Sequence, residues 1–266
     1  MTGRQKNSRK QFFPGDNDPV FIIAEISANH GQSLKRALKL IRTAKECGAN
    51  AVKFQTYTPD TITMNSKKRY FQIKHPVWGG QTLYQLYEKA YTPWRWFKKL
   101  KQEADEVGLV FFATAFDRTA VDLLESLCVP VHKIASPEIV DLPLVEYMAR
   151  TRKPLILSTG MARASEIGEA VRTAKRGGAP EIALLKCVSS YPADPGDMNL
   201  RTISHMRSRY RLMVGLSDHT LGTSVSVAAV PLGAKLIEKH LTFDRGVQTP
   251  DSFFSLEPFE FKELVN

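Results

Sequence analysis

The chain has few cysteines: only Cys47, Cys128 and Cys187 occur among its 266 residues. Their number is odd, they lie far apart, and no two of them form a CxxC motif. A disulfide framework needs paired cysteines and an oxidising environment, so this usage predicts a reducing, cytoplasmic compartment.

Long apolar runs are also missing from the sequence. No stretch approaches the roughly 18 consecutive apolar residues that a membrane-spanning helix needs. The N-terminus has no apolar segment of the kind that a secretory signal peptide carries. We therefore expect no membrane partner.

The first ten residues, MTGRQKNSRK, contain no acidic residue. The whole chain has 37 Lys and Arg against 27 Asp and Glu, which gives a net charge of +10. We interpret residues 1–19 as a basic N-terminal extension and residues 20–266 as one domain. No nucleic-acid-binding motif accompanies the basic head, so we expect no nucleic-acid partner. The remaining positive charge would suit an anionic small substrate.

Short apolar or β-branched runs alternate with longer segments of helical spacing along the rest of the chain. The runs are nearly continuous rather than alternating, which is typical of parallel strands covered on both faces. Eight such units predict a (β/α)8 TIM barrel. The expected strands are 21–26, 51–56, 110–116, 131–136, 154–160, 182–188, 212–217 and 236–243, and the expected helices are 33–47, 93–107, 118–127, 142–151, 163–176, 199–208, 222–232 and one beginning near 257.

An open, doubly wound sheet is the alternative fold, but no glycine-rich fingerprint follows the first expected strand. The connection 57–92 is unusually long, and connections of that length are usually functional or disordered. Its segment LYQLYEKAY (83–91) predicts a short helix that covers one mouth of the barrel.

Polar residues gather at the ends of the expected strands, where barrel enzymes form their active sites. A single serine there is usually a local hydrogen bond to the backbone. Such local hydrogen bonds do not explain why all eight strands end in polar residues. Lysines and hydroxyls that converge at one end of a barrel suit the binding of a phosphate or carboxylate group. The candidates are Glu25, Asn29, His30, Lys53, Gln55, Thr114, Lys133, Ser136, Glu138, Ser158, Thr159, Lys186, Ser189, Ser190, Tyr191, Ser217, Asp218, His219, Glu238, Lys239 and His240.

Two of these candidates, His219 and His240, end neighbouring expected strands, which in a sheet lie about 4.8 Å apart. Two imidazoles so placed could share one divalent ion, and by ligand softness Mn²⁺, Co²⁺ and Zn²⁺ all remain open. Each histidine could instead be a hydrogen-bonded core residue. Asp218 could orient the neighbouring ring or cap the next helix.

Several motifs together resemble the sialic acid (N-acetylneuraminate) synthase family, whose members condense phosphoenolpyruvate with an N-acetylated hexose. The resemblance begins near residue 20 and keeps the family's order and spacing. The segments FQTYTPDTIT, VWGGQTLYQLYEKAYTPWRWF and TPDSFFSL resemble the pseudaminic acid synthase branch more than the N-acetylneuraminate branch. The motifs that carry the resemblance are FIIAEISANHGQSLKRALKLIRTAKECGANAVKFQTYTPDTIT, HKIASPE, PLILSTGMA, KCVSSYP, GLSDHTLG, GAKLIEKHLTF and DSFFSLEP.

The resemblance implies a role for each matching position. His219 and His240 would bind Mn²⁺ or Mg²⁺, with Co²⁺ as an alternative. Glu138 would lie near the reacting carbons. Position 189 carries Ser where the neuraminate enzymes have Asn. The phosphoenolpyruvate site would comprise Lys53, Thr114, Lys133, Ser136, Ser158, Ser189 and Ser217, and the sugar site Glu25, Asn29, Gln55, Tyr191 and Asp251.

The implied reaction joins phosphoenolpyruvate to a diacetamido hexose and gives a nonulosonic acid of the pseudaminic or sialic type, plus phosphate. Alternatives are an N-acetylneuraminate or legionaminate synthase, and a synthase for a phosphorylated sugar, which would need extra basic residues. The resemblance also implies a homodimer in which a C-terminal antifreeze-like domain reaches over the partner's barrel. The sequence stops around the last expected barrel helix, so a barrel that binds phosphoenolpyruvate without turnover is a further alternative.

Overall fold

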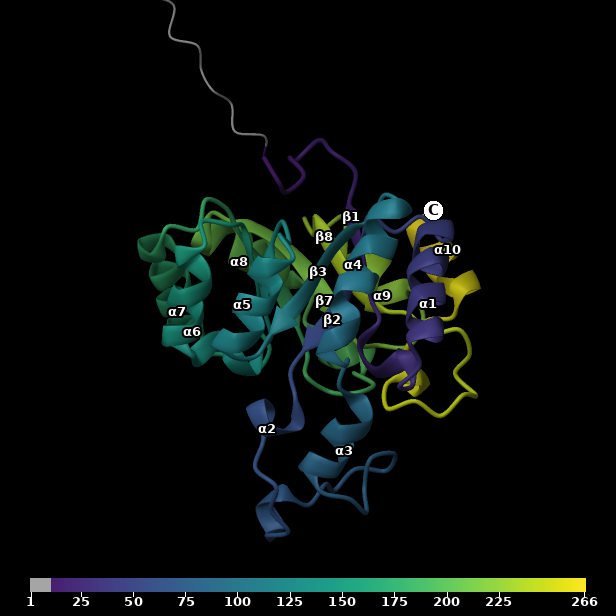
Figure 1. Cartoon of the computed structure of the whole chain (residues 1–266). Coiled ribbons are helices and arrows are strands. Elements are labelled where there is room, and N and C mark those ends of the chain that lie inside the picture. The colour runs from purple at the N-terminus through teal and green to yellow at the C-terminus, as the bar shows by residue number, and fades with distance from the viewer. Residues whose placement is uncertain (1–10) are drawn as a thin grey trace, which may run out of the picture.

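Eight parallel strands form a closed barrel in chain order (Figure 1). The computed structural model describes residues 11–266, so the basic head, residues 1–10, lies outside the described residues. Strand β1 closes the ring against β8, with a register from Phe21 opposite Leu236 to Glu25 opposite His240. The TIM barrel is thus confirmed and the open sheet is wrong. The strands are β1 (Phe21–Glu25), β2 (Ala51–Thr56), β3 (Val110–Ala115), β4 (His132–Ile134), β5 (Leu155–Ser158), β6 (Ile182–Cys187), β7 (Met213–Asp218) and β8 (Leu236–His240).

The helices follow the strands and surround the barrel. Ser33 caps the first helix by accepting a hydrogen bond from the Arg36 amide, and Gly48 ends the turn after it with a φ of 88°. The helix expected from residue 93 starts as a 3₁₀ turn, and α9 is shorter than the expected 222–232. The helices are α1 (Leu34–Glu46), α2 (Pro59–Ile62), α3 (Leu83–Ala90), α4 (Phe97–Glu106), α5 (Arg118–Ser126), α6 (Leu142–Arg150), α7 (Ala164–Gly177), α8 (Arg201–Tyr210), α9 (Ser224–Ala229) and α10 (Pro258–Val265).

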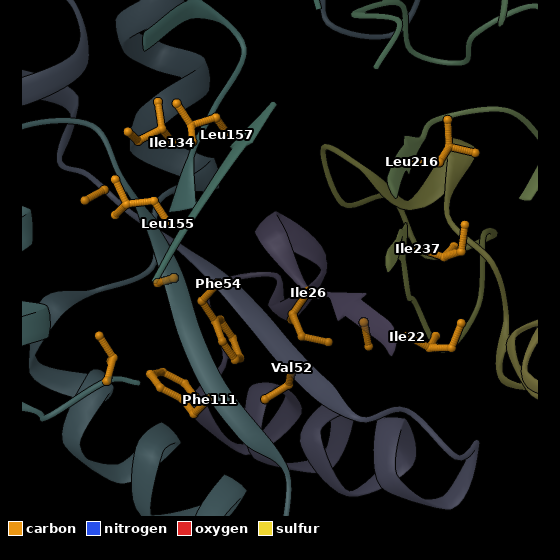
Figure 2. Close-up of a cluster of buried hydrophobic side chains, with 14 of the residues drawn as sticks. Ile22, Ile26, Val52, Phe54, Phe111, Ile134, Leu155, Leu157, Leu216 and Ile237 are labelled. Carbon is orange, nitrogen blue, oxygen red and sulfur yellow. The ribbon is translucent and has the colours of Figure 1, made fainter. Parts of the chain in front are cut away.

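The outward side chains of the strands bind the helices to the barrel. Figure 2 shows Val52 and Phe54 of β2 beside Phe111 of β3, and the two phenylalanine rings are 5.8 Å apart. All three side chains are buried, and each such burial contributes about 1.5–3 kcal/mol. This apolar layer fixes the outer face of every strand, so the other face must point into the barrel.

The inward side chains form two layers. The apolar layer lies nearer the amino ends of the strands and is called the lower layer, and the polar layer lies nearer their carboxyl ends. Residues two apart on a strand share a face, so Ile23 lies below Glu25 and Ala51 lies below Lys53. In β7 the lower position is Gly215, where a Cβ would collide with the backbone of Leu236. The lower layer consists of Ile23, Ala51, Phe112, Val131, Ile156, Ala183, Leu185 and Leu236.

The two ends of the barrel are closed differently. At the end of the barrel formed by the amino ends of the strands, Phe13 packs into the apolar layer. The amides of Phe12 and Phe13 donate to the Glu181 carboxylate. Part of the segment interpreted as an extension therefore belongs to the barrel. The connection with α2 and α3 projects from the opposite end (Figure 1), and α3 is the helix expected over residues 83–91. In residues 11–266, no helix has the length and apolarity needed to cross a membrane.

Candidate active site

A cavity of ≈ 240 Å³ opens at the carboxyl ends of the strands. A larger hollow of ≈ 600 Å³ lies at the other end of the barrel, beside Phe13 and Glu181, and none of the expected site residues lines it. The smaller cavity brings together twelve of the residues to which the family resemblance gives a role: Glu25, Lys53, Gln55, Thr114, Lys133, Ser136, Ser158, Tyr191, Ser217, His219, His240 and Asp251.

Two lysines and two glutamates meet on the floor of this cavity. The Lys53 ammonium lies 2.7 Å from a Glu25 carboxylate oxygen and 3.4 Å from Glu238, which is 3.6 Å from the Lys133 ammonium. Lys53 also donates to the Thr114 hydroxyl at 2.9 Å. All four charged groups are buried, and burying an ion costs several kcal/mol unless a partner compensates. The two glutamates therefore compensate the charge of the two buried lysines.

Burial and charge shift the pKa values of this network in different directions. Burial raises the pKa of Glu25 to about 7, although Lys53 opposes the rise. Burial also lowers the pKa of Lys133. In Glu238 the lysines Lys133 and Lys53 outweigh the effect of burial and lower the pKa. Glu25 is thus a carboxylate that can exchange a proton near neutral pH, while Glu238 stays ionised.

The two strand-end histidines face one another with ring centroids 5.5 Å apart. The His219 Nδ1 lies 2.9 Å from the Val188 carbonyl oxygen and donates to it, which leaves Nε2 as the nitrogen free for another partner. The buried Nδ1 of His240 has no hydrogen-bond partner among the described residues. Burial lowers the pKa of His240 well below its usual value, so its ring is neutral. Neutral imidazole is the form that binds metal ions.

These two rings fit a divalent cation as a partial ligand set. In the part of the chain that the structure describes, no three His, Cys, Asp or Glu side chains converge as a metal site. Water or substrate oxygens would therefore complete the coordination. The orphaned Nδ1 of His240 is the observation that most favours such a ligand, because buried polar atoms rarely lack a partner.

Comparisons with known proteins show the family to which the chain belongs. The model of the NeuB family matches residues 40–266. The chain belongs to the NeuB family. It is 45% identical over 247 residues to a pseudaminic acid synthase of Helicobacter pylori, covering 93% of this chain and 73% of the relative.

Two further NeuB-family relatives show how widely the similarity extends. The chain is 40% identical over 248 residues to an N,N'-diacetyllegionaminic acid synthase of Campylobacter jejuni, covering 92% of this chain and 74% of the relative. A crystal structure of an N-acetylneuraminic acid synthetase from Leptospira borgpetersenii, solved with citrate, superposes with a TM-score of 0.86 at 38% identity. That match covers 95% of this chain and 83% of the solved one. The expected family and barrel are confirmed.

One expected sugar contact of the NeuB-family site, Asn29, lies outside the cavity. Its amide nitrogen donates to the Leu241 carbonyl and to the Ser255 hydroxyl, and its amide oxygen accepts from the Thr249 hydroxyl. The side chain is fully buried, and these contacts use its polar atoms. We therefore correct this expectation: Asn29 fastens the chain after β8 to the end of β1.

Ser189 and Glu138 lie at the margin of the cavity rather than in its lining. A Cβ at Gly160 would come within 2.5 Å of the Ser189 hydroxyl and 2.8 Å of the Ser136 hydroxyl. Gly160 thus leaves room for two hydroxyls, and the buried Ser189 hydroxyl has no hydrogen-bond partner within residues 11–266. Burial raises the pKa of Glu138 to about 7, and one of its carboxylate oxygens also lacks a hydrogen-bond partner in the described part of the chain. Both residues remain candidates for substrate contact.

The open question about Asp218 is answered by its contacts. Its carboxylate accepts from the Thr220 amide, from the Ser226 hydroxyl at the start of α9, and from the buried Lys239 ammonium at 2.8 Å. It faces away from the cavity and does not orient His219. Asp218 and Lys239 therefore form a structural pair between the barrel and α9.

Glu238 was expected only as one of many strand-end candidates, and Cys187 and the aromatic lining were not expected in the site. Glu238 stood in the inventory of strand ends, but nothing marked it as the bridge between the two lysines. Cys187 lies two residues past the inward Leu185, so the strand alternation could have placed it in the site. Burial raises the pKa of its thiol, but His219, Ser136 and Lys133 bring the pKa to about 7. The overlooked aromatic residues of the lining are Tyr57, Trp78, Tyr87, Phe116 and Phe254.

Proposed function

We propose that this protein condenses phosphoenolpyruvate with an acetamido sugar and releases a nonulosonic acid and inorganic phosphate. The observation that carries the proposal is the meeting of Lys53, Lys133 and the His219–His240 pair in one cavity. Cationic donors and imidazoles in one buried site suit an anionic substrate beside a metal-bound carbonyl. The synthase relatives support the same reaction.

The lysines would bind the phosphate and carboxylate of phosphoenolpyruvate. Lys133 donates to the Ser158 hydroxyl at 2.8 Å, and Lys53 donates to the Thr114 hydroxyl, so both ammonium groups are held by neutral neighbours as well as by glutamates. Such preorganised donors stabilise charge without moving during the reaction. The hydroxyls of Ser136, Ser189 and Ser217 would complete this subsite.

The acceptor would lie between the histidines and the mouth of the cavity, in contact with Gln55, Tyr191 and Asp251. When bound by His219 and His240, Mn²⁺, Mg²⁺ or Co²⁺ would act as a Lewis acid on the sugar carbonyl. In the reaction, C3 of phosphoenolpyruvate bonds to the carbonyl carbon, water adds to C2, and the C2–O bond to phosphate breaks. Glu25 and Glu138, whose pKa values burial raises to about 7, would take and return the protons.

The cavity favours an uncharged acceptor over a phosphorylated sugar. Within residues 11–266 the lysines and arginines of the lining are Lys53 and Lys133 alone, and phosphoenolpyruvate would use both. A second phosphate would enter without a cation to compensate it, which is unfavourable in a buried site. The relatives named pseudaminic acid synthases favour the diacetamido hexose of that branch, and we take 2,4-diacetamido-2,4,6-trideoxy-altrose as the acceptor to test. From the family resemblance we further propose a cytoplasmic homodimer.

Phosphate release tests this function. The protein is incubated with phosphoenolpyruvate, Mn²⁺ and either the diacetamido sugar or N-acetylmannosamine, with a chelator as control. Chelator-sensitive release with the diacetamido sugar is the expected result. Tight binding of phosphoenolpyruvate without release from either acceptor would contradict the proposal and favour a barrel that binds but does not turn over.

A further inference from the structure

The mouth of the cavity is aromatic, whereas its floor is charged. Tyr57, Trp78, Tyr87 and Phe254 line the same cavity as the lysine–glutamate network. Tyr57 contacts Tyr87 edge-on, with ring centroids 5.4 Å apart. A ligand held by the lysines would therefore also contact aromatic rings, whose only polar side-chain atoms other than the Trp78 indole nitrogen are the hydroxyls of Tyr57 and Tyr87.

Trp78 is the part of this wall contributed by the long connection between β2 and α3. Its indole Nε1 donates to the Pro250 carbonyl at 2.7 Å, and its ring lies 5.8 Å from Tyr191 and 5.7 Å from Phe253. Since the indole has one N–H group and Pro250 uses it, no polar atom of Trp78 remains for a ligand. Trp78 consequently presents a purely apolar surface to the cavity.

His75 holds Trp78 in this place. Its Nδ1 accepts from the amides of Val77 and Trp78, so Nε2 carries the proton and donates to the Tyr191 carbonyl at 3.3 Å. The imidazole also stacks on the indole, with centroids 4.4 Å apart and planes 26° apart. The turn closes through Gly79, whose amide donates to the His75 carbonyl and where a Cβ would lie 2.5 Å from that oxygen. One turn thus connects the loop to the end of β6.

We propose that Trp78, positioned by His75, selects the acceptor sugar by its methyl-bearing end. The inference rests on the proposed function and names the acceptor class: sugars with a deoxy methyl or acetamido methyl in place of a free hydroxyl. A methyl group against the indole gains from being buried. A hydroxyl in the same place loses its water without gaining a partner, which reduces binding. His75 is a positioning residue that acts through Trp78 and Tyr191.

The test compares two acceptors in four variants and one control variant. We measure kcat/KM for 2,4-diacetamido-2,4,6-trideoxy-altrose and for N-acetylmannosamine, with phosphoenolpyruvate and Mn²⁺ saturating. Trp78→Ala should lower kcat/KM for the diacetamido sugar by about 10-fold or more, because one apolar contact is worth that much discrimination. The value for N-acetylmannosamine should change much less, so the ratio of the two falls. Trp78→Phe, which keeps an aromatic face, should restore part of the ratio.

Positioning by His75 has its own pair of variants. His75→Ala should reduce the ratio as Trp78→Ala does, whereas His75→Asn should rescue it, because the amide oxygen can accept from the Val77 and Trp78 amides. Tyr70→Ala is the matched control: Tyr70 belongs to the same connection, is 78% exposed and does not line the cavity. It should leave both constants unchanged.

Equal losses for both acceptors in Trp78→Ala would overturn the inference while leaving the proposed function intact. Failure of the wild-type protein to release phosphate would instead contradict the proposed function. In that case calorimetric titration of the two sugars into the protein with phosphoenolpyruvate gives the same comparison through binding. Equal affinities, or no binding of either sugar, would then overturn the inference as well.

Discussion

The Glu238 carboxylate lies 3.6 Å from the Lys133 ammonium in the interior of the barrel, and both side chains are almost completely buried. The same carboxylate oxygen is 3.4 Å from Lys53, so one anion serves two cations. Glu238 therefore compensates both lysines while no anion is bound, which explains how a site built for an anion stays folded. An arriving phosphate can then neutralise the same two lysines.

Lys133→Met should abolish activity and also destabilise the fold, because it removes one of the two cations that compensate Glu238. Loss of one partner of a buried pair costs about 3–5 kcal/mol of unfolding free energy. Urea unfolding measures this cost, and the double variant Lys133→Met/Glu238→Gln should recover most of it without recovering activity. Equal stability of the two variants would show that the pair is not coupled.

His240→Ala should remove metal-dependent phosphate release with little loss of stability. The His240 Nδ1 has no partner among the described residues, so the truncation leaves no broken hydrogen bond at that atom. Titration of Mn²⁺ by calorimetry should show at least a 10-fold weaker binding. His205→Ala, a change at an exposed position of α8, is the control and should bind Mn²⁺ normally. Unchanged Mn²⁺ affinity in His240→Ala would refute its role as a ligand.

The sequence was sufficient to predict the barrel because each strand and helix carries a local signal. The apolar runs, the cap at Ser33 and the stop at Gly48 all act within a few residues. Part of the site was predictable for the same reason. Successive side chains of a strand point to opposite faces, and this places Lys53, Thr114 and Ser217 on the inner face. These assignments needed no knowledge of which strands are opposite one another.

The parts that could not be predicted depend on contacts distant in sequence. Asn29 follows β1 and reads as a site residue, but Thr249 and Ser255, more than 200 positions away, take up its side chain. Glu238 became central only when the closed barrel placed it between two lysines. Trp78 reached the cavity through a turn that ends on Pro250. No local pattern encodes such distant partners.

Glu138→Gln should stabilise the protein at alkaline pH and leave it unchanged in acid. Burial raises the pKa of Glu138 from 4.5 to about 7, so the folded state binds more protons than the unfolded state between these values. The free energy of unfolding of the wild type therefore falls as pH rises through this window. Glutamine does not titrate, so its advantage should grow from zero near pH 4 to at most about 3 kcal/mol above pH 8.

Thermal or urea unfolding across pH 4–9 measures this difference for Glu138→Gln. The activity profile should change too, since the limb near pH 7 that a protonating carboxylate produces would disappear. Parallel stability curves for wild type and variant would show that the pKa of Glu138 is not raised. The predicted stability difference with an unchanged activity profile would place the Glu138 carboxyl group away from the chemistry.

Gly160→Ala should weaken phosphoenolpyruvate binding while leaving the fold nearly intact. The added methyl would come within 2.5 Å of the Ser189 hydroxyl and 2.8 Å of the Ser136 hydroxyl, so one of them must turn away from the space they share. Since that hydroxyl then no longer donates to the phosphate, we expect a rise in KM for phosphoenolpyruvate of about 10-fold, the value of one hydrogen bond to a charged group. The acceptor KM should be unaffected.

Gly168→Ala is the matched control for this glycine. It lies within α7, and its nearest neighbour to a new Cβ is a flexible arginine end at 3.4 Å, so alanine fits there. Alanine in a helix interior is more favourable than glycine by about 1 kcal/mol, and this variant should be slightly more stable with unchanged KM. If both variants behave alike, the hydroxyls of Ser136 and Ser189 do not bind the phosphate, and the anion is held by the two lysines and the remaining strand-end hydroxyls alone.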